Sequence, residues 1–365
     1  MRGRNAVTGR ALLAVSGLLL LARCASPGPP AEPSAAAKPA QSGAGSSPTQ
    51  AAQSPGAPPP LTRVSAGYGA LTALYIPLWI AGDEKLFEKY GLDVELLDLP
   101  GNTGPQSLVA GQVPIVALSG YAAVPSMVEG ADLVMLTSNV QRQTAQVYSV
   151  PAVDSPQALR GKRLGITRPG TLTHFGGLLA LREWGLKPDE DVSFVNMNES
   201  ANILAGLVSG AVDAGVLTDP NTFRAAKEGF RLLADLADFP TEYLATGVTT
   251  THAYARENRP VLLNFIRGFT EGLRRYYDDR ALAEDVLRRY VRVDDPEVLA
   301  KTYTLYAEKY FVKLPLPNVQ GMQNILDDYA VVNPRARELD ASRLIDASFV
   351  QELQREGFFR SLGLE

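Results

Sequence analysis

The chain has 365 residues, with 35 Lys and Arg against 39 Asp and Glu, and 45% of its residues are hydrophobic. This length predicts two lobes rather than one small core, and the ordinary apolar content excludes a disordered chain and a polytopic membrane protein. The formal net charge of −4 excludes the strongly basic surface with which proteins bind nucleic acid.

Residues 1–23 are typical of a secretory signal peptide. Arg2, Arg4 and Arg10 precede a short apolar run at residues 11–22, which is the usual order of charged and apolar regions in such signals. The run is shorter than the roughly 20 residues that span a bilayer. We therefore expect an exported protein in the periplasm or at the outer face of the cytoplasmic membrane.

Cys24, the only cysteine of the chain, follows this run. Its context resembles the bacterial lipoprotein cleavage motif, although Arg23 stands where a small residue is usual. The resemblance implies lipidation of Cys24, which would anchor a soluble domain to a membrane. The alternative is an ordinary cleaved signal peptide with an incidental cysteine. Because there is no second cysteine, no disulfide can form within the chain.

The segment at residues 24–60 predicts a tether between this anchor and a folded part that starts at residue 61. After Cys24 it consists mostly of Pro, Ala, Ser and Gly. Such a segment buries too little apolar surface to offset the entropy of ordering it. We expect a disordered linker that lets the folded part reach a partner in the membrane.

An internal repeat with an offset near one hundred residues organises the folded part. Three short matches recur in the same order: GALT with GTLT (residues 69–72 and 170–173), YGL with WGL (90–92 and 184–186), and LVAGQVPIVALS with LVSGAVDAGVLT (108–119 and 207–218). Each copy of the first match follows a predicted strand and opens a predicted helix. Repetition of this kind indicates that one structural unit occurs twice.

The repeat predicts an α/β fold of two lobes, each with a mainly parallel sheet flanked by helices. Right-handed crossovers bring the strand carboxyl ends to one edge, where ligands bind in such sheets. Residues 146–150 and 246–251 are predicted to pair as a two-strand hinge. Lobe one would comprise residues 61–150 and a largely helical tail at 251–365, and lobe two residues 151–250.

This arrangement resembles the periplasmic substrate-binding proteins of the nitrate/sulfonate/taurine and thiamine-pyrimidine-precursor type. The most specific stretch is ALYIPLWIAGDEKLFEKYGLDVEL at residues 73–96, in which the positions that fit the family pattern are Pro77, Trp79, Glu84, Phe87, Gly91 and Leu92. The resemblance covers essentially all of residues 61–365. It implies the type II periplasmic-binding-protein fold, which agrees with the two lobes predicted from the repeat.

The resemblance also implies partners. Proteins of this family capture a small molecule and deliver it to the permease and ATPase subunits of an ABC importer. For this chain we expect a monomer that uses no cofactor, binds no nucleic acid and meets the membrane through its lipid anchor. The ligand class is small and polar or heteroaromatic, such as a sulfonate, a nitrate-like anion or a thiamine-precursor pyrimidine.

Two other functions use the same fold. A related branch is an enzyme that makes the thiamine pyrimidine at a cysteine-rich site, and a sensory receptor would present the same ligand-closed state to a signalling protein. Because Cys24 in the leader is the only cysteine, the sequence disfavours the enzyme. We therefore expect no enzymatic activity and assign no catalytic residue.

The loops of the repeat carry the first candidate ligand groups. GALT and GTLT open helices, whose free N–H groups and positive dipole ends attract polar or anionic atoms. We predict ligand contacts from Gly69, Thr72, Thr171 and Thr173, and the alternative is that the threonines only cap helices. The neighbouring Arg168 would favour a carboxylate, sulfonate or phosphate, unless it is a solvated loop residue.

Further candidates follow the other strands. Tyr68 and Tyr121 are suited to stacking on a planar ligand, although Tyr121 is equally suited to packing. Asp219 suits an amine, and equally a cap for the helix that starts at Pro220. The remaining candidates lie near strand ends or helix starts, where the asparagines serve equally as caps: Asn102, Ser119, Gln143, His174, Asn198 and Thr218. The only histidines, His174 and His252, lack metal-ligand spacing, so no metal site is predicted.

Overall fold

A computed structural model of the protein describes residues 60–365. The signal peptide, the anchor at Cys24 and the linker predicted for residues 1–60 fall outside this range, except for Pro60. Within residues 60–365, none of the helices combines the length and the apolar character that crossing a membrane requires.

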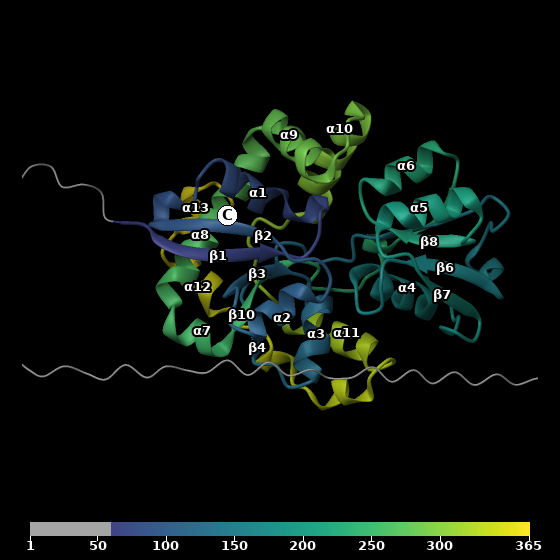
Figure 1. Cartoon of the computed structure of the whole chain (residues 1–365), viewed down its shortest axis with the longest axis horizontal. Coiled ribbons are helices and arrows are strands. Elements are labelled where there is room, and N and C mark those ends of the chain that lie inside the picture. The colour runs from purple at the N-terminus through teal and green to yellow at the C-terminus, as the bar shows by residue number, and fades with distance from the viewer. Residues whose placement is uncertain (1–59) are drawn as a thin grey trace, which may run out of the picture. The chain divides into compact units, whose positions relative to one another are not determined.

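The first five-stranded sheet has the order β2-β1-β3-β10-β4 (Figure 1). β1 pairs in parallel with β2 and β3, and β10 is antiparallel to β3 and β4. The strands are β1 Thr62–Tyr68, β2 Leu92–Asp98, β3 Ile115–Leu118, β4 Leu133–Met135 and β10 Gly247–Thr251, and the helices between them are α1 Ile76–Asp83, α2 Thr103–Val109 and α3 Gly120–Val128. The central strand β3 is buried along its whole length, as expected for a strand covered by helices on both faces.

The second sheet repeats this order as β7-β6-β8-β5-β9. Its strands are β5 Gln146–Ser149, β6 Lys162–Ile166, β7 Val192–Asn196, β8 Ala214–Leu217 and β9 Arg231–Asp235, and its helices are α4 Leu172–Glu183, α5 Ser200–Ser209 and α6 Asn221–Lys227. β6 is parallel to β7 and β8, and β5 is antiparallel to β8 and β9. The two mixed sheets flanked by helices confirm the predicted fold class, and their shared strand order explains the sequence repeat.

The predicted pairing of residues 146–150 with 246–251 is wrong. β5 belongs to the second sheet and β10 to the first, so each strand lies in the sheet opposite to the lobe that the sequence predicted for it. Both stretches have the extended, buried pattern of a strand, and this local pattern carries no information about which neighbour completes the hydrogen bonds.

The chain instead crosses between the sheets in two connecting segments, residues 136–145 and 236–246. These segments run side by side: the N–H of Asn139 donates to the carbonyl of Thr246 at 2.8 Å, and the N–H of Ala245 donates to the carbonyl of Val140 at 2.9 Å. We propose that the boundaries between the lobes lie in these segments.

The last third of the described chain is helical and packs largely on the first sheet. Its helices are α7 His252–Glu257, α8 Arg259–Asp278, α9 Arg280–Val291, α10 Pro296–Leu305, α11 Val319–Tyr329, α12 Ser348–Arg355 and α13 Phe358–Ser361, and a π-helical turn, η5, covers Tyr306–Tyr310. α8 lies so close to α1 that a Cβ at Gly272 would be 2.0 Å from the carbonyl oxygen of Pro77. Only glycine allows this approach of the two helices.

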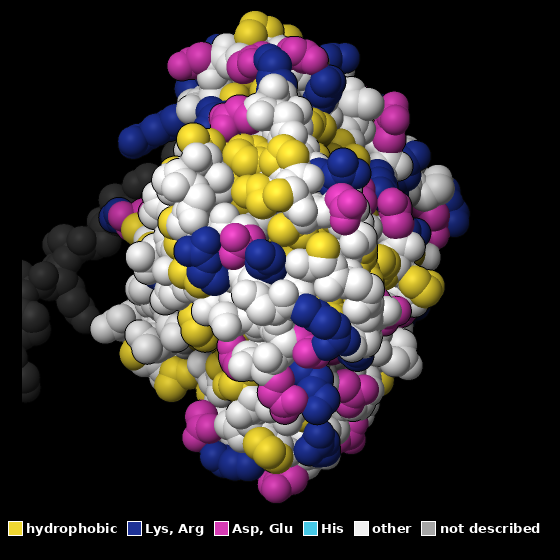
Figure 2. Space-filling view, turned by 90° about the vertical axis from the view of Figure 1, so that its right-hand side faces the viewer, with side chains coloured by type: hydrophobic (Ala, Val, Ile, Leu, Met, Phe, Trp, Pro, Cys, Tyr) yellow, Lys and Arg dark blue, Asp and Glu magenta, His cyan; other side chains and the backbone are white. Residues whose placement is uncertain are grey.

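The face over the second sheet carries Lys and Arg interspersed with Asp and Glu (Figure 2). Ion pairs among the residues of this lobe join Arg163 to Asp213 at 3.0 Å and Lys187 to Glu190 at 2.9 Å. At a distance from the surface, the electrostatic fields of neighbouring positive and negative charges largely cancel. Recognition of a charged molecule therefore depends on local groups, which the loops at the strand ends provide.

Candidate ligand-binding site

The loop after β6 places Arg168 beside the start of α4. Thr171 precedes α4 without capping it; its hydroxyl donates to the carbonyl of Arg168 at 2.6 Å and lies 2.8 Å from the hydroxyl of Thr167. Thr173 is buried, and its Oγ1 accepts a hydrogen bond from the N–H of Thr167 at 2.9 Å. These bonds fix the loop and leave the first N–H groups of α4 without a side-chain acceptor.

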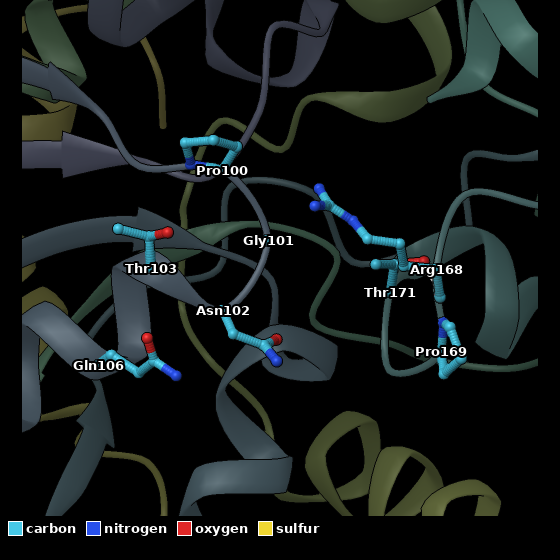
Figure 3. Close-up of a pocket in the computed structure, with 8 residues that line it drawn as sticks. All are labelled: Pro100, Gly101, Asn102, Thr103, Gln106, Arg168, Pro169 and Thr171. Atoms are coloured by element: carbon cyan, nitrogen blue, oxygen red, sulfur yellow. Dashed lines mark hydrogen bonds between the residues drawn. The ribbon is translucent and has the colours of Figure 1, made fainter. Parts of the chain in front are cut away.

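Arg168 extends from this loop towards Gly101, in the loop between β2 and α2 (Figure 3). A Cβ at Gly101 would lie 3.1 Å from the guanidinium carbon. A cavity of about 220 Å³ separates the two loops, and its lining residues are Pro100, Gly101, Asn102, Thr103, Gln106, Arg168, Pro169 and Thr171. The buried Nε of Arg168 has no hydrogen-bond partner among residues 60–365. The forked donors of a guanidinium in such a cavity suit a carboxylate or sulfonate.

The corresponding loop after β1 holds Thr72 and Gly69. Thr72 precedes the short helix η1, Ala73–Tyr75, and its buried hydroxyl has no partner in the described part of the chain. The N–H of Gly69 donates to the carbonyl of Ala117 at 3.1 Å. Tyr68 packs edge-on against Trp79, with ring centroids 5.5 Å apart. The buried hydroxyl of Thr72 is therefore available as a hydrogen-bonding group for a ligand.

Tyr121 and Gln143 lie in the protein interior. The ring of Tyr121 is fully buried and stacks on Phe175, with centroids 4.6 Å apart. Gln143 Nε2 donates to the Tyr121 hydroxyl at 3.3 Å and to the carbonyl of Leu172 at 3.1 Å. Through these contacts Tyr121 and Gln143 pack against the first turn of α4. This agrees with the alternative interpretation, in which Tyr121 is a packing residue.

His174 is also buried, and its Nδ1 accepts a hydrogen bond from the N–H of Gly170 at 3.1 Å. Burial lowers the pKa of His174, so its ring is neutral at pH 7. Within residues 60–365, no group of three or more His, Cys, Asp or Glu side chains is placed to hold a metal ion. Because His174 accepts the hydrogen bond from Gly170, it helps to shape the loop that carries Arg168.

β8 is followed by Thr218 and Asp219, and the peptide bond between Asp219 and Pro220 is cis. The N–H of Thr218 donates to Ser200 Oγ at 3.1 Å. Asp219 is 1% exposed; its Oδ1 accepts a hydrogen bond from the hydroxyl of Thr222, and its Oδ2 has no partner among the residues described. Burial raises the pKa of Asp219 to about 7. β6 and β8 are adjacent and parallel, so Arg168 and Asp219 follow neighbouring strands of one sheet.

Of the remaining candidates, Asn102 lies beside Arg168, whereas Ser119 and Asn198 do not. Ser119 caps α3, since its Oγ accepts from the N–H of Ala122 at 3.2 Å. Asn102 lines the Arg168 cavity, whereas Asn198 lines a separate, open hollow beside α5. Sequence reasoning missed Gln106 as a lining residue, because an exposed glutamine on a helix carries no local signal of a cavity.

The fold is that of periplasmic binding proteins, and comparison with known proteins identifies the family. Residues 73–281, more than half of the 365-residue chain, match the NMT1/THI5-like family. The chain therefore belongs to that family, as the sequence resemblance predicted.

A curated relative is the taurine-binding periplasmic protein of Escherichia coli K12, which is 30% identical over 132 residues. This match covers 36% of the present chain and 40% of the relative, so it spans less than half of that protein's length.

Solved structures resemble the chain over a longer range. The aliphatic sulphonate-binding protein SsuA of Escherichia coli has a TM-score of 0.66 at 20% identity, over 78% of this chain and 92% of its own. The nitrate-binding protein NrtA of Synechocystis PCC 6803 has a TM-score of 0.64 at 13% identity, over 81% and 89%. At these identities the likeness shows the fold.

Proposed function

We propose that the chain is an exported solute-binding lipoprotein that captures a small molecule with an anionic group and delivers it to an ABC importer. The observation that carries this proposal is the guanidinium of Arg168, whose buried Nε has no hydrogen-bond partner among residues 60–365 and which faces the cavity beside Gly101. Family membership supports it, because the names of the relatives specify taurine, sulphonate and nitrate binding.

The geometry suits capture by closure. Arg168 and Thr171 come from the loop after β6 in the second sheet, whereas Gly101 and Asn102 come from the loop after β2 in the first. A solute between these loops would contact both lobes only when they are close together. Its binding energy would then favour the closed state over the open one.

We also propose a location for the protein and a fate for the solute. Lipidation of Cys24 would hold the folded part at the outer face of the cytoplasmic membrane, next to the permease and ATPase subunits of the importer. We propose that the protein releases the solute chemically unchanged. The absence of any cysteine except Cys24 from the sequence supports binding rather than the chemistry of the pyrimidine-forming branch.

A thermal-shift experiment tests the proposal. The mature protein is heated with ethanesulfonate, taurine, nitrate or a pyrimidine, and we expect at least one solute to raise Tm, because a ligand of the native state stabilises it. Arg168→Ala should abolish the shift caused by an anion. The matched control is Arg160→Ala, which removes an exposed arginine paired with Asp191 and should leave the shift intact. If no solute raises Tm, or if Arg168→Ala responds as the wild type does, the proposal is wrong.

A further inference from the structure

Asp328 connects three parts of the chain that meet beside the second lobe. It lies near the end of α11, which packs against α3 of the first lobe (Figure 1). One of its carboxylate oxygens pairs with the guanidinium of Arg182 in α4, and the other accepts a hydrogen bond from the hydroxyl of Tyr243. Tyr243 belongs to the connecting segment at residues 236–246. A single carboxylate therefore links the tail, a connecting segment and the second lobe.

The helices α4 and α11 also share an apolar contact. Its buried side chains are Phe175, Leu178 and Leu179 of α4 and Met322, Ile325 and Leu326 of α11. Residues three, four and seven apart lie on one face of a helix, so Arg182 continues the apolar face of α4 by one turn. Apolar contacts have no preferred direction, whereas the hydrogen bonds between a guanidinium and a carboxylate do. The ion pair therefore fixes the position at which the two helices meet.

This ion pair is poorly suited to stabilising the fold. The side chain of Asp328 is 3% exposed and that of Arg182 is 47% exposed. Burial raises the pKa of Asp328, although Tyr243 and Arg182 oppose the shift. For the carboxylate, the loss of hydration is therefore larger than the gain from its contacts. For Arg182 the balance is the opposite: burial disfavours its charge, but Asp328 and Tyr243 together raise its pKa. Buried ion pairs often add little stability, and some instead select one arrangement of the chain.

α4 is held at both ends by groups outside the second sheet. At its start, Gln143 Nε2 donates to the carbonyl of Leu172 at 3.1 Å, and near its end Arg182 pairs with Asp328. The helix has 12 residues, which makes it about 18 Å long. The loop that carries Arg168 lies directly before it. A change in the angle of α4 would therefore move this loop relative to the first lobe.

Other ion pairs between the tail and the second lobe lie on different elements. Lys309 pairs with Asp235 at the end of β9, and Lys227 of α6 pairs with Asp295. In the described part of the chain, β9 and α6 carry none of the residues that line the cavity between the loops after β2 and β6. The contact of α4 with α11 is thus the one that acts on a helix directly attached to the candidate site.

We propose that Asp328 is a positioning residue for solute capture. Through Arg182 it sets the angle of α4, and thereby the position of the Arg168 loop relative to the loop after β2. Asp328 acts on the site of the proposed function, on which this inference rests. Without the ion pair α4 takes several angles, and only a fraction of the molecules presents both loops to a solute at once. The apparent affinity decreases by that fraction.

Replacing the polar groups by apolar ones separates positioning from stability. The triple variant Arg182→Met, Tyr243→Phe and Asp328→Leu removes both charges and leaves no buried hydroxyl without its acceptor. Such replacements are often neutral or stabilising, so we expect Tm to stay close to that of the wild type. Calorimetric titration with ethanesulfonate, taurine and nitrate measures affinity. We expect about tenfold weaker binding of each of these solutes that binds the wild type, as for the loss of a charge-assisted hydrogen bond.

The distance between the lobes is measured without solute, by pulsed electron paramagnetic resonance. Spin labels are attached at Val109→Cys in α2 and Val208→Cys in α5, two exposed positions in different lobes. Cys24→Ser prevents labelling of the native cysteine. We expect a narrow distance distribution when Asp328 is present and a broader one in the triple variant. A contact that only stabilises the fold would leave this distribution unchanged.

Two further variants complete the test. Arg182→Met alone provides it if the triple variant does not fold, because Arg182 is only half buried; it should also broaden the distribution and weaken binding. The control is Arg267→Met with Glu356→Leu, which removes a 2.6 Å ion pair within the tail. Since both residues lie on the same lobe, this control should change neither the distribution nor the affinity.

The outcomes separate this role of Asp328 from the proposed function. If the variants keep a narrow distribution, whether or not Tm decreases, Asp328 does not position the second lobe and the inference is wrong. If the distribution broadens but the solute binds as tightly as to the wild type, the angle of α4 does not limit capture and the inference is also wrong. If the wild type binds none of the three solutes, the proposed function is contradicted, while a broadened distribution would still support the role of Asp328 in placing α4.

Discussion

Lys309 Nζ lies 2.8 Å from Asp235 Oδ2 and thereby joins the C-terminal tail to the last strand of the second sheet. Asp235 has a side-chain exposure of 13%, so loss of Lys309 leaves a mostly buried carboxylate without its cation. We expect Lys309→Ala to lower the free energy of unfolding by about 1.5–3 kcal/mol, the usual value of a hydrogen bond to a charged group. Urea unfolding followed by circular dichroism measures this change.

A second pair between the tail and the second lobe provides the comparison. Lys227 lies 2.6 Å from Asp295, but the two side chains are 47% and 40% exposed. Exposed pairs contribute less than about 1 kcal/mol, so Lys227→Ala should have a small effect. Equal losses in the two variants would show that burial does not set the strength of these contacts.

The stability of the unliganded protein should depend on Asp219. Burial raises the pKa of Asp219 to about 7, whereas the carboxyl of an unfolded chain titrates near 3.9. The folded state therefore holds this proton more tightly, and the stabilisation, fully present below pH 3.9, is lost as pH rises through 7. The free energy of unfolding should decrease between pH 5 and pH 8 because of this group.

Asp219→Asn should remove that part of the pH dependence, and urea unfolding at several pH values measures it. The other charged or titratable groups near Asp219 are Asp235, Lys309, Tyr148, Tyr306 and Tyr310, and all of them remain in the variant. The difference between the two proteins therefore isolates Asp219. Parallel curves for the two proteins across this pH range would contradict the burial of an ionisable Asp219.

Thr72 should contribute to binding from the first sheet. Its buried hydroxyl has no partner within residues 60–365, and it lies at a strand end that corresponds to the loop of Thr171. Thr72→Ala should weaken solute binding by about 0.5–1.5 kcal/mol, the usual value of a neutral hydrogen bond. Calorimetric titration measures the loss, and Thr62→Ala, at the exposed start of β1, is the control. Unchanged affinity in a folded Thr72→Ala protein would remove Thr72 from the site.

Cys24 should determine whether the protein is bound to the membrane. Replacement by serine removes the thiol that lipidation requires, so Cys24→Ser should appear in the soluble fraction after export. Fractionation of cells followed by immunoblotting measures the distribution. If the variant stays in the membrane fraction to the same extent as the wild type, the anchor lies elsewhere.

Local sequence patterns were sufficient to predict most of the fold. The match of residues 108–119 with 207–218 placed β3 and β8 at equivalent positions, and both sheets have the same strand order. Strand partners were harder to predict, because β5 and β10 have the same extended pattern whichever sheet they join. Their assignment depends on long-range hydrogen bonds, such as that between Asn139 and Thr246, which no short pattern encodes.

The candidate site was predicted only in part, because some of its residues are brought together by long-range contacts. Arg168, Asn102 and Thr171 follow strand ends, and the structure brings them together around one cavity. Asp328, which we propose to position the site, gave no signal, because its contact with Arg182 arises only when the tail folds against the second lobe. Tyr121 follows a strand end as Arg168 does, but the apolar side chains around it bury its ring completely.

The most direct test of the proposed function is a crystal structure of the protein with the solute that gives the largest thermal shift. We predict electron density for the solute between the loops after β2 and β6, with its acid group within hydrogen-bonding distance of the guanidinium of Arg168. A solute bound away from Arg168, or contacting only one of the two lobes, would contradict it.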